Sequence, residues 1–96
     1  MYTWIAYDIS SNKARRKIAL SCKRLGLTRI QKSNFLGKVK KRYLHDFEQT
    51  ATSLINPKTD KIYLLPITKE MYQNMIRYGL DFDSERIEAS IRNIFF

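Results

Sequence analysis

The sequence has few of the residues that build disulfides, thiolate metal clusters or hydrolase triads. Cys22 is the only cysteine among 96 residues, so one chain can form neither an intramolecular disulfide nor a thiolate metal cluster. We expect Cys22 to be a small side chain of the hydrophobic core. His45 is the only histidine, and no serine lies near it in the sequence as a triad would suggest. The three glycines form no glycine-rich phosphate loop. The commonest catalytic motifs are therefore missing.

Long apolar runs are also missing. No run approaches the roughly 18 residues of a membrane span, and the basic stretch follows the first apolar segment, which is the reverse of a signal peptide. We therefore expect a cytoplasmic protein without a membrane partner. A chain of 96 residues fits one domain with one core, and a hydrophobic content of 44% is enough to fill that core.

Acidic residues are scarce in the first half of the chain. Residues 9–45 contain twelve lysines and arginines but no aspartate or glutamate, whereas residues 46–96 contain six basic and eight acidic residues. The net charge of +9 is therefore concentrated in the first half. Such a basic region attracts polyanions and releases counterions from phosphates. It predicts nucleic-acid binding, although a merely solvated basic face or a ribosomal-type protein would share this composition.

The chain begins with a predicted strand followed by a predicted helix. Residues 2–9 are rich in β-branched and aromatic side chains. Two serines, Ser10 and Ser11, follow them and signal a helix N-cap. Residues 12–25 carry apolar side chains at helical spacing, and a glycine follows as a stop. On a helical wheel Arg16 falls opposite the apolar stripe and Arg15 at its border, so the outer face is basic. Asp8 is then expected at the carboxyl end of the strand.

The rest of the chain predicts a βαβαβ order with a less regular end. Gly37 allows a bend or turn, and the restriction on the residue before Pro57 ends the second helix. Tyr43, Phe47 and Tyr63 lie at core spacing. The elements expected after the first helix are a β-like stretch over 28–36 that forms one bent strand or two short ones, a helix over 41–55, a strand over 60–67, and two short helices, one through Met71, Met75 and Tyr78 and closed by Gly79, the other through Ile87, Ile91 and Ile94.

Two strand–helix units joined by short connections favour an α+β fold. We expect a ferredoxin-like sandwich, in which a mainly antiparallel sheet carries two helices on one face. Residues 1–68 would form this core and residues 69–96 a C-terminal extension. Residues 91–96 could form a strand that leaves the domain and pairs with the partner chain.

The first strand looks suited to burial on both of its sides. Ile5 and Tyr7 alternate with Trp4 and Ala6, and a sheet with helices on one face leaves the other face uncovered. A contiguous exposed apolar face usually marks an interface. The sequence therefore predicts a homodimer that forms through the uncovered face of the sheet.

Asp8 is the only acidic residue among the first 45 residues. A carboxylate at the rim of a sheet can hold a divalent cation, which activates water and stabilises charge on a phosphodiester. The alternative is that Asp8 only caps the first helix or forms an Asx-turn. One carboxylate is a poor Mg²⁺ site by itself, but a twofold dimer could supply a second Asp8. His45 falls on the solvent side of the second helix and is not expected to be catalytic.

Two short patterns carry a resemblance to a known family. The first is Tyr7-Asp8-Ile9 at a strand end before a basic helix, and the second is Arg29-x-Gln-x-Ser33-x-Phe35. Together with the later segment Asp60-Lys-Ile-Tyr-Leu-Leu-Pro66, and in this order and spacing, they make residues 1–68 similar to the CRISPR-associated protein 2 family.

That resemblance implies a ferredoxin-like, dimeric subunit of the complex that acquires CRISPR spacers, where it bridges dimers of an integrase subunit and binds incoming duplex DNA. Some members are described as Mg²⁺-dependent endonucleases for RNA or DNA, and Mn²⁺ is an alternative metal. Asp8 would be the catalytic residue and metal ligand. The residues expected to contact nucleic acid are Tyr7, Arg15, Arg29, Ser33 and Phe35, joined by Arg16 from the basic outer face. Members often have an acidic residue where this chain has Lys38, so a second metal ligand is not obvious.

Four functions remain open from the sequence. The first is a CRISPR adaptation subunit with metal-dependent endonuclease activity on duplex DNA or single-stranded RNA. The second is the same dimer acting only as a DNA-binding scaffold. The third is a toxin-type ribonuclease of related fold. The fourth is a plain RNA-binding domain, which ranks last because the aromatic signature of an RNA-recognition motif is missing.

Overall fold

The computed structural model describes residues 2–76 and 78 of the chain. In this part the predicted βαβαβ order is confirmed, with the β-like stretch divided into a hairpin of two short strands. No helix in the described residues is long and apolar enough to cross a membrane. The elements are β1 (Tyr2–Asp8), α1 (Asn12–Arg24), β2 (Thr28–Gln31), β3 (Asn34–Lys38), α2 (Lys41–Leu54), β4 (Lys61–Ile67) and α3 (Lys69–Gln73).

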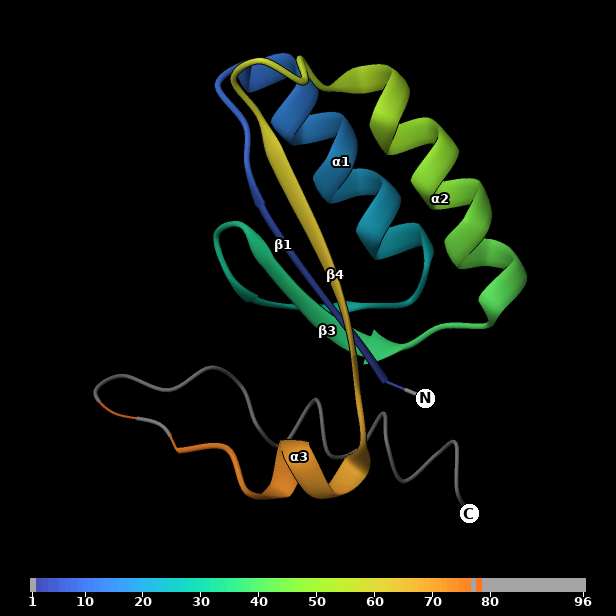
Figure 1. Ribbon diagram of the computed structural model, residues 1–96, viewed down its shortest axis with the longest axis vertical. Helices are drawn as coiled ribbons and strands as arrows, with labels where there is room; N and C mark the ends of the chain where they lie inside the picture. The colour runs from blue at the N-terminus through green and yellow to red at the C-terminus, as the bar shows by residue number, and fades with distance from the viewer. Residues whose placement is uncertain (1, 77, 79–96) are drawn as a thin grey trace.

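The four strands form one antiparallel sheet in the order β2-β3-β1-β4. Figure 1 shows α1 and α2 side by side on one face of this sheet. The first strand lies in the interior of the sheet, where Ile5 pairs with Phe35 of β3 on one side and with Leu64 of β4 on the other. The predicted α+β class, with a mainly antiparallel sheet and two helices on one face, is confirmed.

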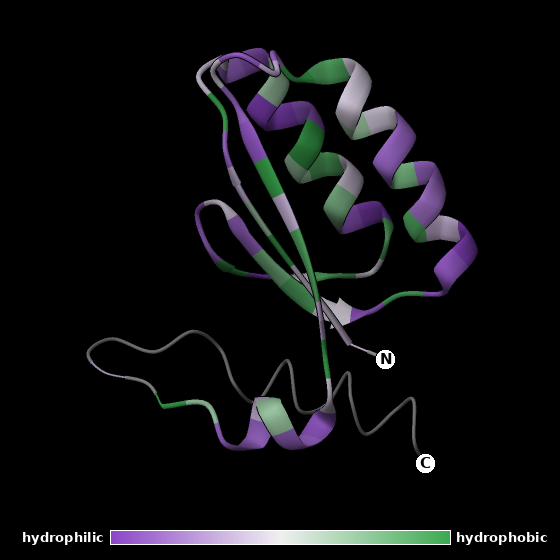
Figure 2. Ribbon diagram, in the orientation of Figure 1, coloured by the Kyte–Doolittle hydropathy of each residue, from purple (hydrophilic) through white to green (hydrophobic). Residues whose placement is uncertain are grey.

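The helix α1 forms where the apolar spacing predicted it. The Ser11 side chain caps its start by accepting a hydrogen bond from the Ala14 amide at 3.2 Å. Its buried residues, among them Ile18 and Cys22, face the sheet. Gly26 follows with φ of 88°, a left-handed conformation that glycine adopts at low cost after a helix. Figure 2 shows the resulting alternation of hydrophobic and hydrophilic segments along both long helices.

Cys22 is a core side chain, as predicted. It is buried in the main cluster between the helices and the sheet. Burial raises the pKa of its thiol to about 12, because the thiolate would lose its hydration. Since the thiolate is the reactive form, the thiol of Cys22 is inert at neutral pH.

Gly37 has a different role from the predicted bend. It lies within β3, paired with Thr3 of β1. A Cβ atom at this position would lie 3.0 Å from Cδ2 of Leu27. The glycine therefore lets β3 pass close to the Leu27 side chain. The turn between the two short strands comes earlier in the chain, between Gln31 and Asn34.

The far face of the sheet is only partly covered. A second cluster of buried residues lies there, to which α3 contributes Tyr72 and the strands contribute Tyr2, Leu36 and Ile67. The helix α3 begins at its Thr68 cap and ends at Gln73, so it is shorter than the helix predicted through Tyr78. The predicted helix through Ile87, Ile91 and Ile94 and the predicted strand over residues 91–96 lie outside the described residues.

The part of this face beyond α3 remains open. Trp4, Ala6, Asn34, Tyr63 and Leu65 line a shallow hollow of about 330 Å³ there. Tyr63 is 59% exposed and Leu65 is 54% exposed, so the expectation of a core position for Tyr63 is wrong. The spacing did not indicate that Tyr63 lies on the face of the sheet that the helices leave open. Tyr43 of α2 is also exposed, whereas Phe47 is buried as predicted.

Candidate nucleic-acid interface

A basic cleft of about 630 Å³ lies between α1 and the turn that joins β2 to β3. Five of its ten lining residues are lysine or arginine, and none is acidic. Positive charges concentrated in a concave surface raise the local potential and attract phosphate groups. The lining residues are Tyr7, Asn12, Arg15, Arg16, Ala19, Leu20, Lys23, Arg29, Lys32 and Ser33.

The cleft brings together five of the six residues for which the sequence predicted contact with nucleic acid. Arg15 and Arg16 come from the first half of α1, Arg29 from β2, and Ser33 from the turn before β3. Tyr7 contributes from β1, and its backbone amide donates to the Ser33 carbonyl at 3.0 Å. Residues that lie 26 positions apart in the sequence therefore share one surface, with strand pairing fixing their relative places.

Phe35 is the residue of this predicted set that does not line the cleft. Its side chain is fully buried, with 0% exposure. The guanidinium carbon of Arg29 lies 5.1 Å from the centre of the Phe35 ring, in cation–π geometry. The two residues are cross-strand partners in the β2–β3 hairpin. The expectation of a direct contact is thus corrected to an indirect one, in which Phe35 supports Arg29 from below.

Tyr7 completes the support beneath Arg29. Its ring stacks on Phe35 with centroids 6.4 Å apart, and only 7% of the residue is exposed. Burial raises the pKa of the Tyr7 hydroxyl, and this effect exceeds the opposing influence of the adjacent Arg29 guanidinium. The hydroxyl is therefore protonated at neutral pH and remains a hydrogen-bond donor.

Asp8 is exposed at the last position of β1, opposite Lys61 of β4. Successive side chains of a strand point to opposite faces, so Asp8 lies on the open face of the sheet and Tyr7 on the helix side. The predicted alternative of a helix cap is wrong, because Ser11 caps α1. Within the described part of the chain, the Asp8 carboxylate accepts no hydrogen bond that would indicate an Asx-turn.

The donor set around Asp8 fits Mg²⁺ only in part. Among the described residues no group of three or more histidine, cysteine or acidic side chains is placed to hold a metal ion. Mg²⁺ nevertheless binds many sites through one or two carboxylates, with water and phosphate oxygens completing six ligands. An exposed Asp8 can supply one such ligand, and a second would have to come from another chain.

A buried carboxylate that the sequence analysis missed lies close to this strand end. Asp60 is 9% exposed and is held in the turn before β4. Its Oδ1 accepts hydrogen bonds from the Ser10 amide at 3.1 Å, the Ser10 hydroxyl at 2.8 Å and the Thr59 hydroxyl at 3.0 Å. Its Oδ2 accepts from the Asn56 amide at 2.8 Å. The Asn-Pro sequence that starts the turn signals a loop, but the bond to Ser10 spans 50 residues and has no local signal.

The hydrogen bonds to Asp60 stabilise its ionised form. The Asn56 amide has the largest effect, followed by the amide and hydroxyl of Ser10, and together they lower the pKa of Asp60 to about 2. Burial acts in the opposite direction but is outweighed. Asp60 is therefore ionised at neutral pH and fully engaged with donors from two loops.

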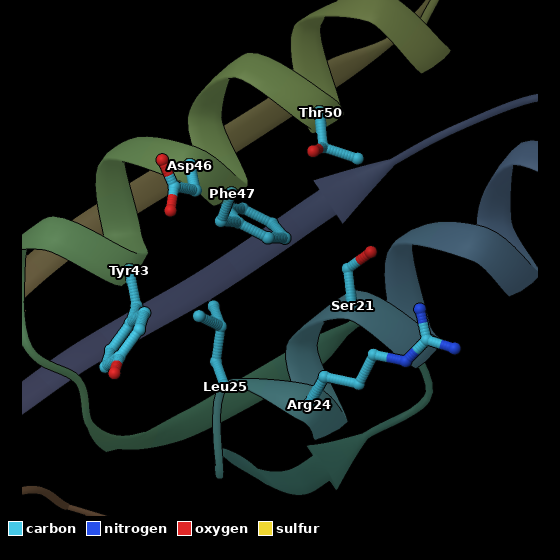
Figure 3. Close-up of a pocket in the computed structure, with 7 residues that line it drawn as sticks. All are labelled: Ser21, Arg24, Leu25, Tyr43, Asp46, Phe47 and Thr50. Carbon is cyan, nitrogen blue, oxygen red and sulfur yellow. The ribbon is translucent and has the colours of Figure 1, made fainter.

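A second hollow, of about 460 Å³, lies between α1 and α2. Figure 3 shows Arg24 and Ser21 on its α1 side and Asp46 and Thr50 on its α2 side. The presence of both charges makes this groove less suited to a polyanion than the basic cleft. His45 lies on the same helix as Asp46, exposed and near Gln49, as the wheel position predicted.

Comparison with known proteins shows which family this arrangement resembles. Residues 1–75 match the model of the family described as CRISPR associated protein Cas2. A protein of Pyrobaculum aerophilum named CRISPR-associated endoribonuclease Cas2 2 is 30% identical over 79 residues, which cover 82% of this chain and 87% of the relative. A protein of Desulforudis audaxviator named CRISPR-associated endoribonuclease Cas2 is 33% identical over 67 residues, covering 70% of this chain and 63% of the relative.

Solved structures agree with this match. The crystal structure of Streptococcus pyogenes Cas2 at pH 6.5 superposes with a TM-score of 0.73 and 26% identity, covering 82% of this chain and all (100%) of the other. A hypothetical protein from Thermus thermophilus superposes with a TM-score of 0.70 and 26% identity, covering 83% of this chain and 92% of the other. The same fold therefore occurs at low sequence identity.

The pKa of Asp60 predicts how the stability of the protein depends on pH. Because its folded pKa of about 2 lies below the unfolded value of about 3.9, its contribution is present above about pH 4 and is lost as the pH falls toward 2. Asp60→Asn should therefore unfold more easily than the wild type at pH 6, and the difference should shrink below about pH 4. Denaturant titrations at several pH values measure the difference in unfolding free energy between the variant and the wild type. Asp46→Asn is the control, and a difference independent of pH would contradict this account.

Proposed function

Because this chain belongs to the CRISPR-associated protein Cas2 family, we propose that it is a Mg²⁺-dependent endonuclease that hydrolyses phosphodiester bonds of RNA or DNA, with Mn²⁺ as an alternative metal. The observation that supports the proposal most directly is a cleft with five basic and no acidic lining residues among those described, whose Tyr7 is followed in β1 by the exposed carboxylate of Asp8 on the opposite face of the sheet. The names of the two curated relatives, both endoribonucleases, favour RNA as the substrate.

The cleft would bind the substrate through its phosphates. Arg16 and Lys23 are exposed along one side of α1, and Arg29 and Lys32 lie on the hairpin across from them. Arginine guanidinium groups bind phosphate oxygens through two parallel hydrogen bonds. Arg29 is held over the Phe35 ring, so less side-chain freedom is lost when it binds. In this proposal, the basic residues of the cleft hold the sugar–phosphate backbone of the nucleic acid in place.

Asp8 would carry the chemistry. Its exposed carboxylate would hold Mg²⁺ as one of six oxygen ligands. A bound Mg²⁺ ion supplies activation of water and stabilisation of the charge that develops on the phosphodiester. Asp8 keeps the metal at the end of β1, and the basic residues of α1 and the hairpin orient the nucleic acid relative to it.

We propose that a homodimer forms through the open face of the sheet. Trp4, Ala6, Tyr63 and Leu65 present an apolar surface there, and exposed apolar patches of this kind usually mark interfaces. Asp8 lies on the same face by strand alternation. A twofold contact would therefore bring two Asp8 carboxylates into one interface and complete the metal ligands. Within the C-terminal extension over residues 69–96, the strand predicted over 91–96 would pair with the partner chain.

One observation favours a second candidate function. Only one carboxylate, Asp8, lies exposed at the end of β1, and the described residues contain no cluster of three metal ligands. A protein of this kind could serve as a non-catalytic scaffold that binds duplex DNA during spacer acquisition and bridges dimers of an integrase subunit. The basic cleft serves both functions, so cleavage rather than binding separates them.

Asp8→Asn tests the endonuclease. The amide keeps the size of the side chain but removes the charge that binds the metal, so cleavage should fall by about 100-fold or more, beyond the typical effect of losing an indirect metal contact. Labelled single-stranded RNA and duplex DNA are incubated with Mg²⁺, Mn²⁺ or EDTA. Asp46→Asn, an exposed carboxylate on α2, should cleave like the wild type. Equal cleavage by Asp8→Asn would contradict the proposal, and no cleavage by the wild type would favour the scaffold.

Arg16→Ala tests the basic cleft. Arg16 and Arg24 are both exposed on α1, two turns apart, but only Arg16 lines the cleft. Loss of one phosphate contact should weaken binding and reduce the slope of log affinity against log salt by about 0.9. Fluorescence titrations of a labelled duplex at several salt concentrations measure both quantities. Arg24→Ala should leave the slope unchanged, and equal effects of the two variants would mean that the cleft is not the binding surface.

Leu65→Arg tests the dimer. The wild type should sediment as two chains at micromolar concentration, and a buried unpaired arginine in the interface should shift it to one chain. Leu20→Arg is the matched control, because Leu20 is 48% exposed on α1 and Leu65 is 54% exposed on the open sheet face. A wild type that sediments as one chain would contradict the proposed dimer.

A further inference from the structure

The end of β1 is fixed by the loop that precedes β4. Asp8 pairs with Lys61, the first residue of β4, in the last rung of the β1–β4 ladder. Asp60, the residue before Lys61, accepts two hydrogen bonds from Ser10, two residues after Asp8. The backbone on both sides of Ile9 is therefore tied to one short segment, Asp60–Lys61.

Ser10 also lies at the junction between the strand and the basic helix. The next residue, Ser11, is the N-cap of α1, and its carbonyl accepts the Arg15 amide at 2.9 Å. A shift of Ser10 would thus move Asp8 on one side and the start of α1 on the other. The contact between Asp60 and Ser10 therefore lies between Asp8 and the start of the helix that lines the cleft.

Asp60 is already engaged by four donors of its own chain. Its Oδ1 accepts from the amide and hydroxyl of Ser10 and from the hydroxyl of Thr59, and its Oδ2 accepts from the amide of Asn56. Bonds from donors to an ionised carboxylate are shorter and stronger than neutral ones. This set of donors fits a carboxylate that holds backbone in place.

We propose that Asp60 is a positioning residue, which acts through Ser10 to hold the Asp8 carboxylate in the geometry that its reaction needs. The inference rests on the proposed role of Asp8 in cleavage. It assigns to Asp60 an effect on turnover and on the order of residues 8–10, and no contact with nucleic acid, because Asp60 does not line the cleft.

Ser10→Ala is the sharpest test, because it removes the hydroxyl that bonds to Asp60 at 2.8 Å and to the Thr59 hydroxyl at 3.3 Å, while the bond from the Ser10 amide to Asp60 remains. We expect kcat to fall about tenfold with KM and duplex affinity unchanged, since loss of a supporting contact misplaces the reacting group without removing a binding contact. Asp60→Ala should lower kcat further, and Asp60→Asn, which keeps an acceptor oxygen, should recover part of the loss.

Two control variants separate positioning from loss of stability. Ser53→Ala removes an exposed serine hydroxyl of α2 that bonds only within its helix. Ile18→Val loosens the buried core and removes none of the hydrogen bonds to Asp60. Both should keep the wild-type kcat well below their unfolding temperatures. A fall in kcat for Ile18→Val as large as that for Ser10→Ala would overturn the proposal.

Amide hydrogen exchange tests the same contact without any cleavage. In Ser10→Ala and Asp60→Asn, the amides of Asp8 and Ser10 should exchange faster than in the wild type, while core amides such as Ile18 remain unchanged. If the wild type does not cleave, the endonuclease proposal fails, but exchange still reports on Asp60. Unchanged exchange at Asp8 and Ser10 in both variants would overturn the positioning role, whatever the result for cleavage.

Discussion

The pairing of β1 on both of its edges is the constraint on which the rest of the structure depends. Because β1 lies between β3 and β4, its backbone is fixed and its side chains must alternate between the two faces of the sheet. Tyr7 is thereby directed to the helix side, below the basic cleft, and Asp8 to the open face. One short strand thus separates a surface suited to phosphate from a carboxylate suited to a metal ion.

The distribution of charge follows from the same arrangement. The cleft concentrates five basic side chains, and no acidic residue of the described part of the chain lines it, so its field attracts a polyanion. Beneath it, Tyr7 and Phe35 use buried aromatic rings to hold Arg29 in place. The strongly stabilised carboxylate of Asp60 accepts bonds from four donors and does not line the cleft.

The local features of the fold were predictable from the sequence, and the non-local ones were not. Apolar spacing located α1 and α2, the serine cap marked the start of α1 and Pro57 marked the end of α2, and alternation identified the two faces of β1, because these signals act between residues close in the chain. The burial of Phe35 and the exposure of Tyr63 depend on which face of the sheet the helices cover. The bonds between Asp60 and Ser10 join residues 50 positions apart, and no local pattern indicates them.

Two roles define the proposed site: Asp8 holds a divalent metal ion at the end of β1, and the basic cleft on the other face of the sheet binds the nucleic acid. The most direct measurement is a Mn²⁺ titration of the full chain bound to a non-cleavable oligonucleotide, followed through the paramagnetic broadening of backbone amide signals. If Asp8 binds the metal, broadening should begin at Asp8 and its neighbours in β1 and at the start of β4. Broadening centred on the acidic residues of α2, or spread evenly over the chain, would contradict it.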